Sequence, residues 1–224
     1  MIIYKGMTEM SDNIMLVGLC GRSGSGKGYV SAIFESLGLP SVDTDAVYRE
    51  ITGPSDKFSP CMAELIERYG KNVVSPDNSL NRPAMRDIVF SGDRQALDDL
   101  NSITHKHILK HTLEKAEQLA AGGHNIILID APLLYESGFD KLCRATVCVT
   151  ASESVIIDRI IKRDGISEED ARKRLATQKS REELEDRSDF VISNDTDKPT
   201  LISRVKECAE KLKEIYIKEY SNEI

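Results

Sequence analysis

The sequence predicts a doubly wound α/β fold on a five-stranded parallel sheet, with a helical insertion and a helical lid. Four short apolar runs, rich in β-branched residues and continuous rather than alternating, are typical of strands buried on both faces. The runs are IMLVGL (14–19), NIILID (125–130), ATVCVT (145–150) and FVIS (190–193), and a short fifth strand is expected in LPSVD, which ends at Asp43. Helical patterns lie between them, in YVSAIFESLG, SESVIIDRIIKRD and DKPTLISRVKECAEKLKEIYIKEY, where apolar residues recur at three- and four-residue spacing. This alternation predicts a parallel sheet with helices on both faces.

Two segments interrupt the alternation. From about residue 59 to residue 123 there is no convincing strand, but AELIERYG, RPAMRDIVF and the long stretch DRQALDDLNSITHKHILKHTLEKAEQLAAGG have helical patterns, and Gly122 and Gly123 suit a C-cap. The second segment, GISEEDARKRLATQKSREELEDRSD, is dense in both charge signs and begins with a capping box formed by Ser167 and Asp170. The first segment predicts a helical insertion between the second and third strands, and the second predicts a mobile helical lid.

Composition narrows the possible partners. At 224 residues the chain has room for one α/β core with an accessory lobe, and its formal net charge of −7 argues against nucleic acid or an anionic membrane as a partner. No apolar run approaches the roughly 20 residues that span a bilayer, and the N-terminal residues show no long apolar segment before a cleavage site. Five scattered cysteines without a C-x-x-C pair favour buried thiols over disulfides or zinc. We expect a cytoplasmic protein, a monomer or a small homo-oligomer.

The stretch GRSGSGKG, from Gly21 to Gly28, follows the first strand and opens the first helix. In this setting backbone N–H groups and the positive end of the helix dipole point at one spot, which predicts a phosphate-binding loop. Lys27 adds a cation for the outer phosphates of a nucleotide. Gly28 departs from the G-x-x-x-x-G-K-[ST] pattern, because a Ser or Thr hydroxyl would otherwise be a Mg²⁺ ligand there.

Asp130 ends the strand NIILID and is the acidic residue placed to hold Mg²⁺. It either binds the ion directly or through a water, since Mg²⁺ keeps several waters beside nucleotide phosphates. The alternative is that Asp130 only caps the following turn. The sequence alone leaves both open.

Two more carboxylates, Asp43 and Asp45, lie in VDTDAVYRE at the end of the short strand. This is the edge of an open α/β sheet where ligands bind, so either residue is placed to orient a substrate hydroxyl and accept its proton. Asp45 also suits the N-cap of the next helix, and one residue can serve both roles.

Arg159 and Arg163 are four residues apart, so they share one face of the helix that leads into the lid. Guanidinium groups at this position are suited to hold a transferring phosphoryl group, whereas Arg181 and Arg187 have a weaker case. His107 and His111 have the spacing of a zinc pair, but no neighbouring Cys or Glu completes a ligand set, so packing or surface roles are favoured.

Together these motifs resemble the dephospho-coenzyme A kinases, a family of P-loop small-molecule kinases. The resemblance runs from about Met15 to Asn194 and rests on the phosphate loop, the D-x-D of VDTDAVYRE, the stretch DNSLNRPAMRDIVF and His105 in the long helical segment. It also rests on DAPLLYESG and on the spaced pattern R-x-x-x-R, Q-x-x-R and D-x-V-I-x-N. Of these, DAPLLYE is the most specific.

The resemblance implies phosphorylation of the ribose 3′-hydroxyl of dephospho-coenzyme A by ATP with Mg²⁺, the last step of coenzyme A synthesis. It also implies a nucleotide-binding core (14–58, 125–165 and 188–224), a helical domain that binds the coenzyme A moiety (59–124) and a lid (166–187), after an N-terminal extension (1–13).

Site residues follow from the same resemblance. Asp45, the second acid of D-x-D, is implied as the base, and Lys27, Arg159 and Arg163 as the residues that serve the phosphates. The implied ATP-binding residues are Ser23, Gly24, Ser25, Gly26, Lys27, Gly28 and, near the adenine, Asn194. The implied acceptor-binding residues are Asp43, Arg82, His105, Leu133, Leu134 and Glu136.

Two positions depart from the family pattern, Gly28 where Ser or Thr is usual and Lys106 where Pro usually follows the histidine. The Lys106 departure indicates a local helix difference. Two alternatives to the main interpretation remain. One is another nucleoside or nucleotide kinase, because the core and the loop alone would look similar, and the other is a nucleotide-binding protein whose catalysis is impaired because Gly28 replaces Ser or Thr. DAPLLYE and the long helical segment argue against the first of these.

Overall fold

A computed structural model describes residues 13–92 and 94–220. Contacts divide the chain into two compact units, one formed by the residues before Asp43 together with those from Ala116 onward, and the other by Asp43–Lys115. Apart from its last residue, the expected N-terminal extension lies outside the described residues.

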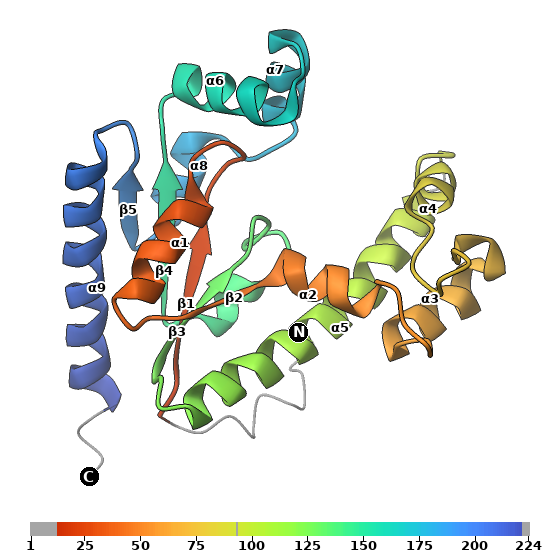
Figure 1. Ribbon diagram of the computed structural model, residues 1–224, viewed down its shortest axis with the longest axis horizontal. Helices are drawn as coiled ribbons and strands as arrows, with labels where there is room; N and C mark the ends of the chain where they lie inside the picture. Colours follow the sequence, from red (N-terminus) through yellow and green to blue (C-terminus); the bar gives the residue numbers. More distant parts are fainter. Residues whose placement is uncertain (1–12, 93, 221–224) are drawn as a thin grey trace. The chain divides into compact units, whose positions relative to one another are not determined.

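The first unit is built on a five-stranded parallel sheet with the strand order β2-β3-β1-β4-β5 (Figure 1). Its strands are β1 (Met15–Cys20), β2 (Ser41–Asp43), β3 (Ile126–Asp130), β4 (Ala145–Thr150) and β5 (Phe190–Ser193). Every residue of β1, β3 and β4 is buried, which explains why these strands are continuous apolar runs. The predicted fold class is therefore confirmed, with each strand within two residues of its expected place.

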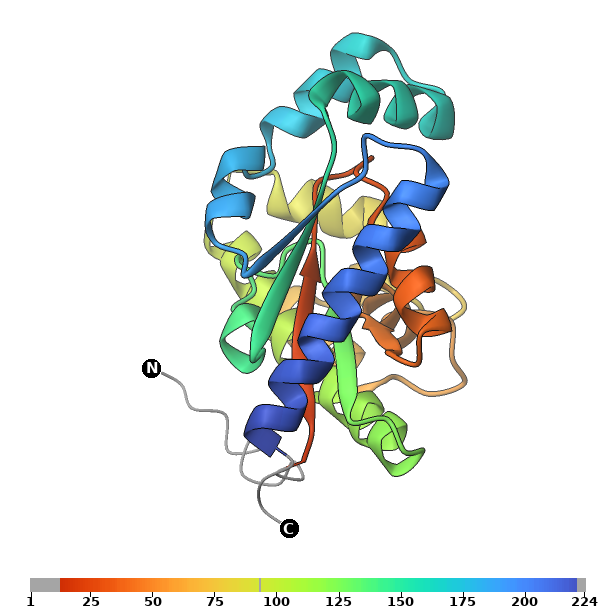
Figure 2. The same cartoon turned by 90° about the vertical axis from the view of Figure 1, so that its left-hand side faces the viewer.

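Helices α1 (Lys27–Ser36) and α9 (Lys198–Tyr220) pack side by side on one face of this sheet (Figure 2). Their apolar stripes meet β1 and β4 in one core, where Phe34 of α1 and Val205 and Leu212 of α9 are almost completely buried. Because α1 begins at Lys27 rather than at Tyr29, the end of the glycine-rich loop is already helical.

Three helices follow β4 in order: α6 (Glu153–Asp164), which leads into the expected lid, and α7 (Glu168–Ala176) and α8 (Arg181–Asp186), which lie within it. The first two share a small apolar core that includes Ile160 and Leu175. The Ser167 hydroxyl accepts from the Asp170 N–H at 3.1 Å and donates to the Asp170 carboxylate at 2.7 Å, which confirms the capping box. Of the described helices, none is both long enough and apolar enough to cross a bilayer.

The second unit is helical. The segment expected to form a helical insertion contains α3 (Pro60–Tyr69), η1 (Lys71–Val73), α4 (Arg82–Val89) and α5 (Arg94–Ala121), which continues into the first unit. The second unit also contains α2 (Thr44–Ile51), which precedes that segment. Ser59 and Asn81 cap the N-termini of α3 and α4 through their side-chain oxygens. The expected C-cap glycines follow α5, where Gly123 has a φ of 93° and its N–H donates to the Ala120 carbonyl at 2.8 Å.

The cysteines agree with the expectation of buried thiols. All five are free, and four of them, Cys20, Cys61, Cys148 and Cys208, are buried.

Candidate active site

The glycine-rich loop joins the carboxyl end of β1 to the first turn of α1 and has a backbone that only glycine adopts readily. Gly24 and Gly26 have φ values of 83° and 89°, in the left-handed region. A Cβ on Gly26 would lie 2.1 Å from the Asn194 Nδ2, and one on Gly24 would lie 2.8 Å from the Ile156 carbonyl oxygen. The loop therefore needs glycine at both positions for conformation and for space.

Carbonyl groups of the loop are held by side chains from α6 and from the end of β5. The Ser25 carbonyl accepts from Asn194 Nδ2 at 2.7 Å and from Arg159 Nη1 at 3.2 Å, and Arg159 also donates to the Gly24 carbonyl at 3.3 Å. Because a trans peptide is planar, fixing the Ser25 carbonyl directs the Gly26 N–H the opposite way. These contacts orient a backbone donor of the kind that a phosphate requires.

The sequence predicted Arg159 and Asn194 as site residues but did not show which atoms they contact. Arg159 reaches the phosphate loop as expected, but its partners are the loop carbonyls and the Asn194 carbonyl, at 3.0 Å, from Nη2. Asn194 is 6 % exposed and its side-chain amide is bonded to the loop. Its role near the adenine remains a prediction.

Lys27 and Asp130 form an ion pair at the base of the loop. Asp130 is the register partner of Leu19 across β1 and β3, so adjacent strands place its carboxylate beside the loop. Asp130 is almost fully buried, and its side chain is 9 % exposed against 17 % for Lys27. The two groups that the sequence assigned to the outer phosphates and to Mg²⁺ are thus in direct contact.

The residues present fit Mg²⁺ held mainly by phosphates and water. Among the described residues no group of three His, Cys, Asp or Glu side chains is placed to bind a metal ion, and Asp130 is a carboxylate at the loop beside Lys27. A Cβ built on Gly28 meets no atom within 4 Å, which leaves room for a water where a hydroxyl ligand would be. Asp130 would hold the ion directly or through such a water.

The lid and the end of α6 both contact the loop, and the sequence predicted only some of the contacting residues. Arg163, a predicted site residue, donates from Nη2 to the Ser23 hydroxyl at 3.2 Å. Gln178 accepts from the Ser23 N–H at 3.0 Å, and Arg22 donates to the Leu175 carbonyl at 2.9 Å. Gln178 and Arg22 were missed as site residues, and the only signal for Gln178 was its place in the Q-x-x-R pattern.

Asp164 connects Arg163 to the lid. It accepts from Arg163 at 2.8 and 2.9 Å and also pairs with Arg174 of α7. Hydrogen bonding from Arg163, reinforced by Arg174, lowers the pKa of the Asp164 carboxyl to about 2. The carboxylate therefore stays charged at neutral pH and keeps Arg163 in place.

The turns after β3 carry DAPLLYE. Leu133 is 55 % exposed and Glu136 is also exposed, so both are accessible to an acceptor. Leu134 is fully buried, and a Cβ on Gly18 would lie 2.7 Å from its Cδ2, so its side chain packs inside the first unit. The buried side chain of Leu134 therefore holds the DAPLLYE segment in place.

In the second unit the D-x-D carboxylates have different roles. Asp43 Oδ1 accepts from the N–H groups of Asp45 and Ala46 at 2.8 and 3.1 Å, so Asp43 is the N-cap of α2. The alternative in which Asp45 caps this helix is wrong, because the helix begins one residue before Asp45. Asp45 lies exposed in the first turn, and among the described residues its carboxylate has no hydrogen bond or ion pair.

The other predicted residues of this unit lie on α4 and α5. The Arg82 guanidinium lies 5.0 Å from the centre of the Tyr48 ring, and burial lowers the pKa of His105. Glu64 pairs with Lys106 at 2.5 Å and with His107 Nε2 at 3.0 Å. Lys106 thus continues α5 with a local ion pair, and His107 has a structural partner.

The structure therefore brings together the predicted ATP-binding and phosphate-binding residues in the first unit. These are Ser23, Gly24, Ser25, Gly26, Lys27, Gly28, Asp130, Arg159, Arg163 and Asn194. Leu133, Leu134 and Glu136 belong to the same unit, whereas Asp43, Asp45, Arg82 and His105 belong to the second.

Comparison with known proteins gives the same family as the motifs. The family model described as dephospho-CoA kinase matches residues 15–200. A dephospho-CoA kinase from Corynebacterium efficiens is 35 % identical over 81 % of this chain and 88 % of its own length. One from Anaeromyxobacter dehalogenans is 37 % identical over 80 % of this chain and 83 % of its own length.

Solved structures agree on the fold. The crystal structure of TT1252 from Thermus thermophilus has a TM-score of 0.73 and 25 % identity, covering 89 % of this chain and 97 % of that one. A dephospho-CoA kinase from Campylobacter jejuni has a TM-score of 0.64 over the same shares of the two chains, at 23 % identity. The family model and the relatives confirm the resemblance seen in the motifs, and the chain belongs to the dephospho-CoA kinase family of phosphotransferases.

Proposed function

We propose that this chain transfers the γ-phosphoryl group of ATP to the ribose 3′-hydroxyl of dephospho-coenzyme A, giving coenzyme A and ADP. Dephospho-CoA kinase activity, the final step of coenzyme A synthesis, is the function of the family to which it belongs. The observation that best supports the proposal is the loop at 21–26 with Lys27 and Asp130 at its base, since this is the arrangement that phosphoryl transfer from a nucleotide requires.

On the donor side, the residues from Ser23 to Gly28 bind the ATP phosphates, with Lys27 as the cation. The ion pair in the structure keeps Lys27 beside the loop, where a γ-phosphate competes with Asp130 for its ammonium group. Arg163 stabilises the charge of the transferring group from the lid side, and Arg159 keeps the loop carbonyls turned away from it. Asn194 serves the same loop near the adenine.

Asp130 is the residue that would hold Mg²⁺ at the donor site, directly or through a water. The bound ion would neutralise charge on the β- and γ-phosphates.

On the acceptor side, Asp45 accepts the proton of the 3′-hydroxyl as the hydroxyl oxygen attacks the γ-phosphorus and the bond to ADP breaks. Its exposed carboxylate supports this role over that of Asp43, whose oxygens are bonded to α2 and to Arg49. The proposed acceptor-binding residues are Asp43, Arg82, His105, Leu133, Leu134 and Glu136.

We assign nucleotide binding to residues 14–58, 125–165 and 188–224, binding of the coenzyme A moiety to 59–124, and lid closure to 166–187. The chain acts in the cytoplasm on small molecules, without nucleic acid or membrane, as a monomer or small homo-oligomer.

The proposal predicts a clear acceptor preference. With ATP and Mg²⁺, mass spectrometry should show a singly phosphorylated product from dephospho-coenzyme A, and none from adenosine or AMP at matched concentrations. Reactions without acceptor measure wasteful ATP hydrolysis. Comparable kcat/KM values for adenosine or AMP would instead indicate another nucleoside or nucleotide kinase.

Gly28→Ser tests whether the hydroxyl that the phosphate loop lacks at this position would serve as a Mg²⁺ ligand. The open space at this position accepts the new side chain, and its hydroxyl adds a Mg²⁺ ligand, so the Mg²⁺ concentration for half-maximal rate should fall. Removing a helical glycine should also stabilise the fold by about 0.5 kcal/mol. Gly28→Ala is the matched control, because it adds helix propensity without a hydroxyl. Equal Mg²⁺ dependence in the two variants would show that the hydroxyl adds no ligand.

A further inference from the structure

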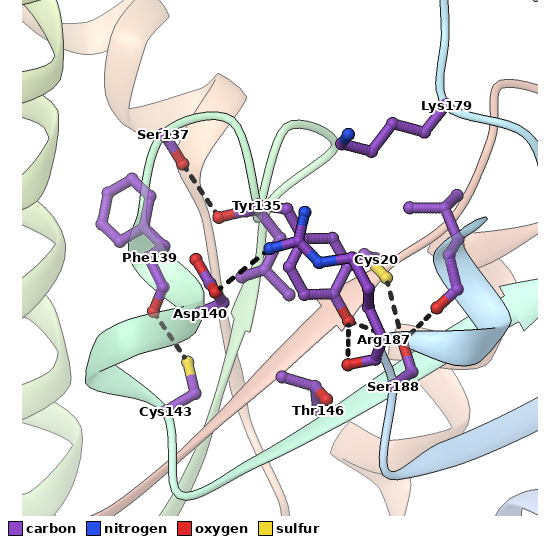
Figure 3. Close-up of polar contacts among 12 residues, drawn as sticks. Cys20, Tyr135, Ser137, Phe139, Asp140, Cys143, Thr146, Lys179, Arg187 and Ser188 are labelled. Carbon is purple, nitrogen blue, oxygen red and sulfur yellow. Dashed lines mark hydrogen bonds and ion pairs between the residues drawn. The ribbon is translucent and has the colours of Figure 1, made fainter.

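Tyr135, in the turns after β3, contacts the residues that end the lid segment (Figure 3). Its hydroxyl lies 2.7 Å from the Ser188 hydroxyl and 3.0 Å from the Arg187 carbonyl oxygen. Ser188 in turn donates to the Leu184 carbonyl at 2.8 Å. Because each hydroxyl carries one hydrogen, Tyr135 donates to the Arg187 carbonyl and Ser188 donates to the Leu184 carbonyl or to the Tyr135 oxygen, which can accept. This relay satisfies carbonyl groups at the C-terminal end of α8.

A second contact joins the same two segments. The Arg187 guanidinium lies 4.0 Å from the centre of the Tyr135 ring, and its Nη2 lies 3.6 Å from Asp140 Oδ2 (Figure 3). Asp140 lies in η2 (Phe139–Leu142), directly after the turns that carry Tyr135. Its side chain is 19 % exposed, so the charge of Arg187 faces a largely desolvated carboxylate. Arg187 is therefore held by the ring on one side and by the carboxylate on another.

The two segments joined here serve opposite sides of the proposed reaction. Tyr135 lies between Leu134 and Glu136, and the turns that contain them are closed by the Ser137 hydroxyl, which donates to the Leu133 carbonyl at 2.7 Å. Arg187 and Ser188 follow the lid, whose Gln178 accepts from the Ser23 N–H of the phosphate loop. One side chain, Tyr135, therefore connects the acceptor-side turns to the end of the lid.

We propose that Tyr135 is a positioning residue that couples binding of the acceptor to placement of the lid over ATP. This inference rests on the proposed function, because it takes the turns at 131–138 as part of the acceptor site. Through Ser188 and Arg187, the hydroxyl and ring of Tyr135 fix the lid's C-terminal end when the acceptor orders these turns. The coupling is reciprocal, so the acceptor tightens ATP binding by the factor by which ATP tightens acceptor binding.

Tyr135→Phe tests the hydroxyl while keeping the ring that Arg187 covers. Calorimetry measures the affinity for a non-hydrolysable ATP analogue with and without dephospho-coenzyme A. The ratio of the two affinities is the coupling factor. We expect a factor of about fivefold or more in the wild type and a factor near one in the variant, with the affinity for the analogue alone unchanged. Ser188→Ala should have the same effect, and the double variant should add nothing to either single change, since both remove one relay.

Tyr216→Phe is the matched control, because its hydroxyl bonds the Asn13 carbonyl at 3.3 Å, outside the lid. A purely structural role for Tyr135 would lower the melting temperature and leave the coupling factor unchanged. That result, or a wild-type coupling factor of one, would overturn the inference. A wild-type chain that binds both ligands but forms no product would contradict the proposed function instead, so the two failures are distinguishable.

Discussion

Replacing Asp45 by Asn lowers kcat for the phosphorylation of dephospho-coenzyme A by about 10²- to 10⁴-fold, because the amide cannot accept the proton of the attacking hydroxyl. The affinity for ATP stays within about twofold, since the phosphate-binding residues are untouched. Steady-state kinetics together with ATP titration measure both quantities. Because Asp45 is exposed in the first turn of α2 and its carboxylate has no hydrogen bond among the described residues, the change should leave the fold intact.

Asp43→Asn is the matched control for this prediction. Asn is as good an N-cap as Asp, so the contacts to the N–H groups of Asp45 and Ala46 should persist and stability should change little. Its effect on kcat should be much smaller than that of Asp45→Asn. If the two variants exchange these effects, Asp43 is the base and Asp45 is not.

Lys27→Met should lower kcat/KM by about 10²- to 10³-fold, through loss of the cation that stabilises charge on the transferring group. It should also lower the free energy of unfolding by about 1–3 kcal/mol, because the buried Asp130 loses the ammonium group that it faces. Chemical denaturation and steady-state kinetics separate the two effects.

The double variant Lys27→Met/Asp130→Asn separates two roles of Lys27: neutralising the buried charge of Asp130, and taking part in catalysis. Removing the buried charge of Asp130 should recover much of the lost stability without recovering activity. Recovery of activity in the double variant would show that Lys27 acts by neutralising Asp130 rather than by binding phosphate.

The sheet and the phosphate loop were predictable because both rest on local sequence. Strands buried on both faces must be apolar throughout, so β1, β3 and β4 stood out, and the loop lay between a strand and a helix as the pattern requires. The N-cap of α7 at Ser167 was predictable for the same reason, because a capping box depends on residues that are close in the sequence.

What the sequence could not predict was which atoms the long polar side chains contact. Helical spacing placed Arg159 and Arg163 on one face, but only the tertiary fold decides that Arg159 binds loop carbonyls while Arg163 reaches the Ser23 hydroxyl. Gln178 belongs to the Q-x-x-R pattern, but that pattern does not show that its side chain contacts the loop. The sequence favoured Asp45 as the helix cap, but α2 begins at Thr44, so Asp43 takes that position instead.

A single-turnover reaction of the wild-type chain with ATP, Mg²⁺ and dephospho-coenzyme A, with the product analysed by phosphorus NMR, tests whether the chain catalyses phosphoryl transfer with Gly28 in its phosphate loop. We expect coenzyme A that carries the new phosphate on the ribose 3′-oxygen. If ATP binds but no product forms until Gly28 is replaced by Ser, the natural chain is a nucleotide-binding protein on a kinase fold and not a kinase.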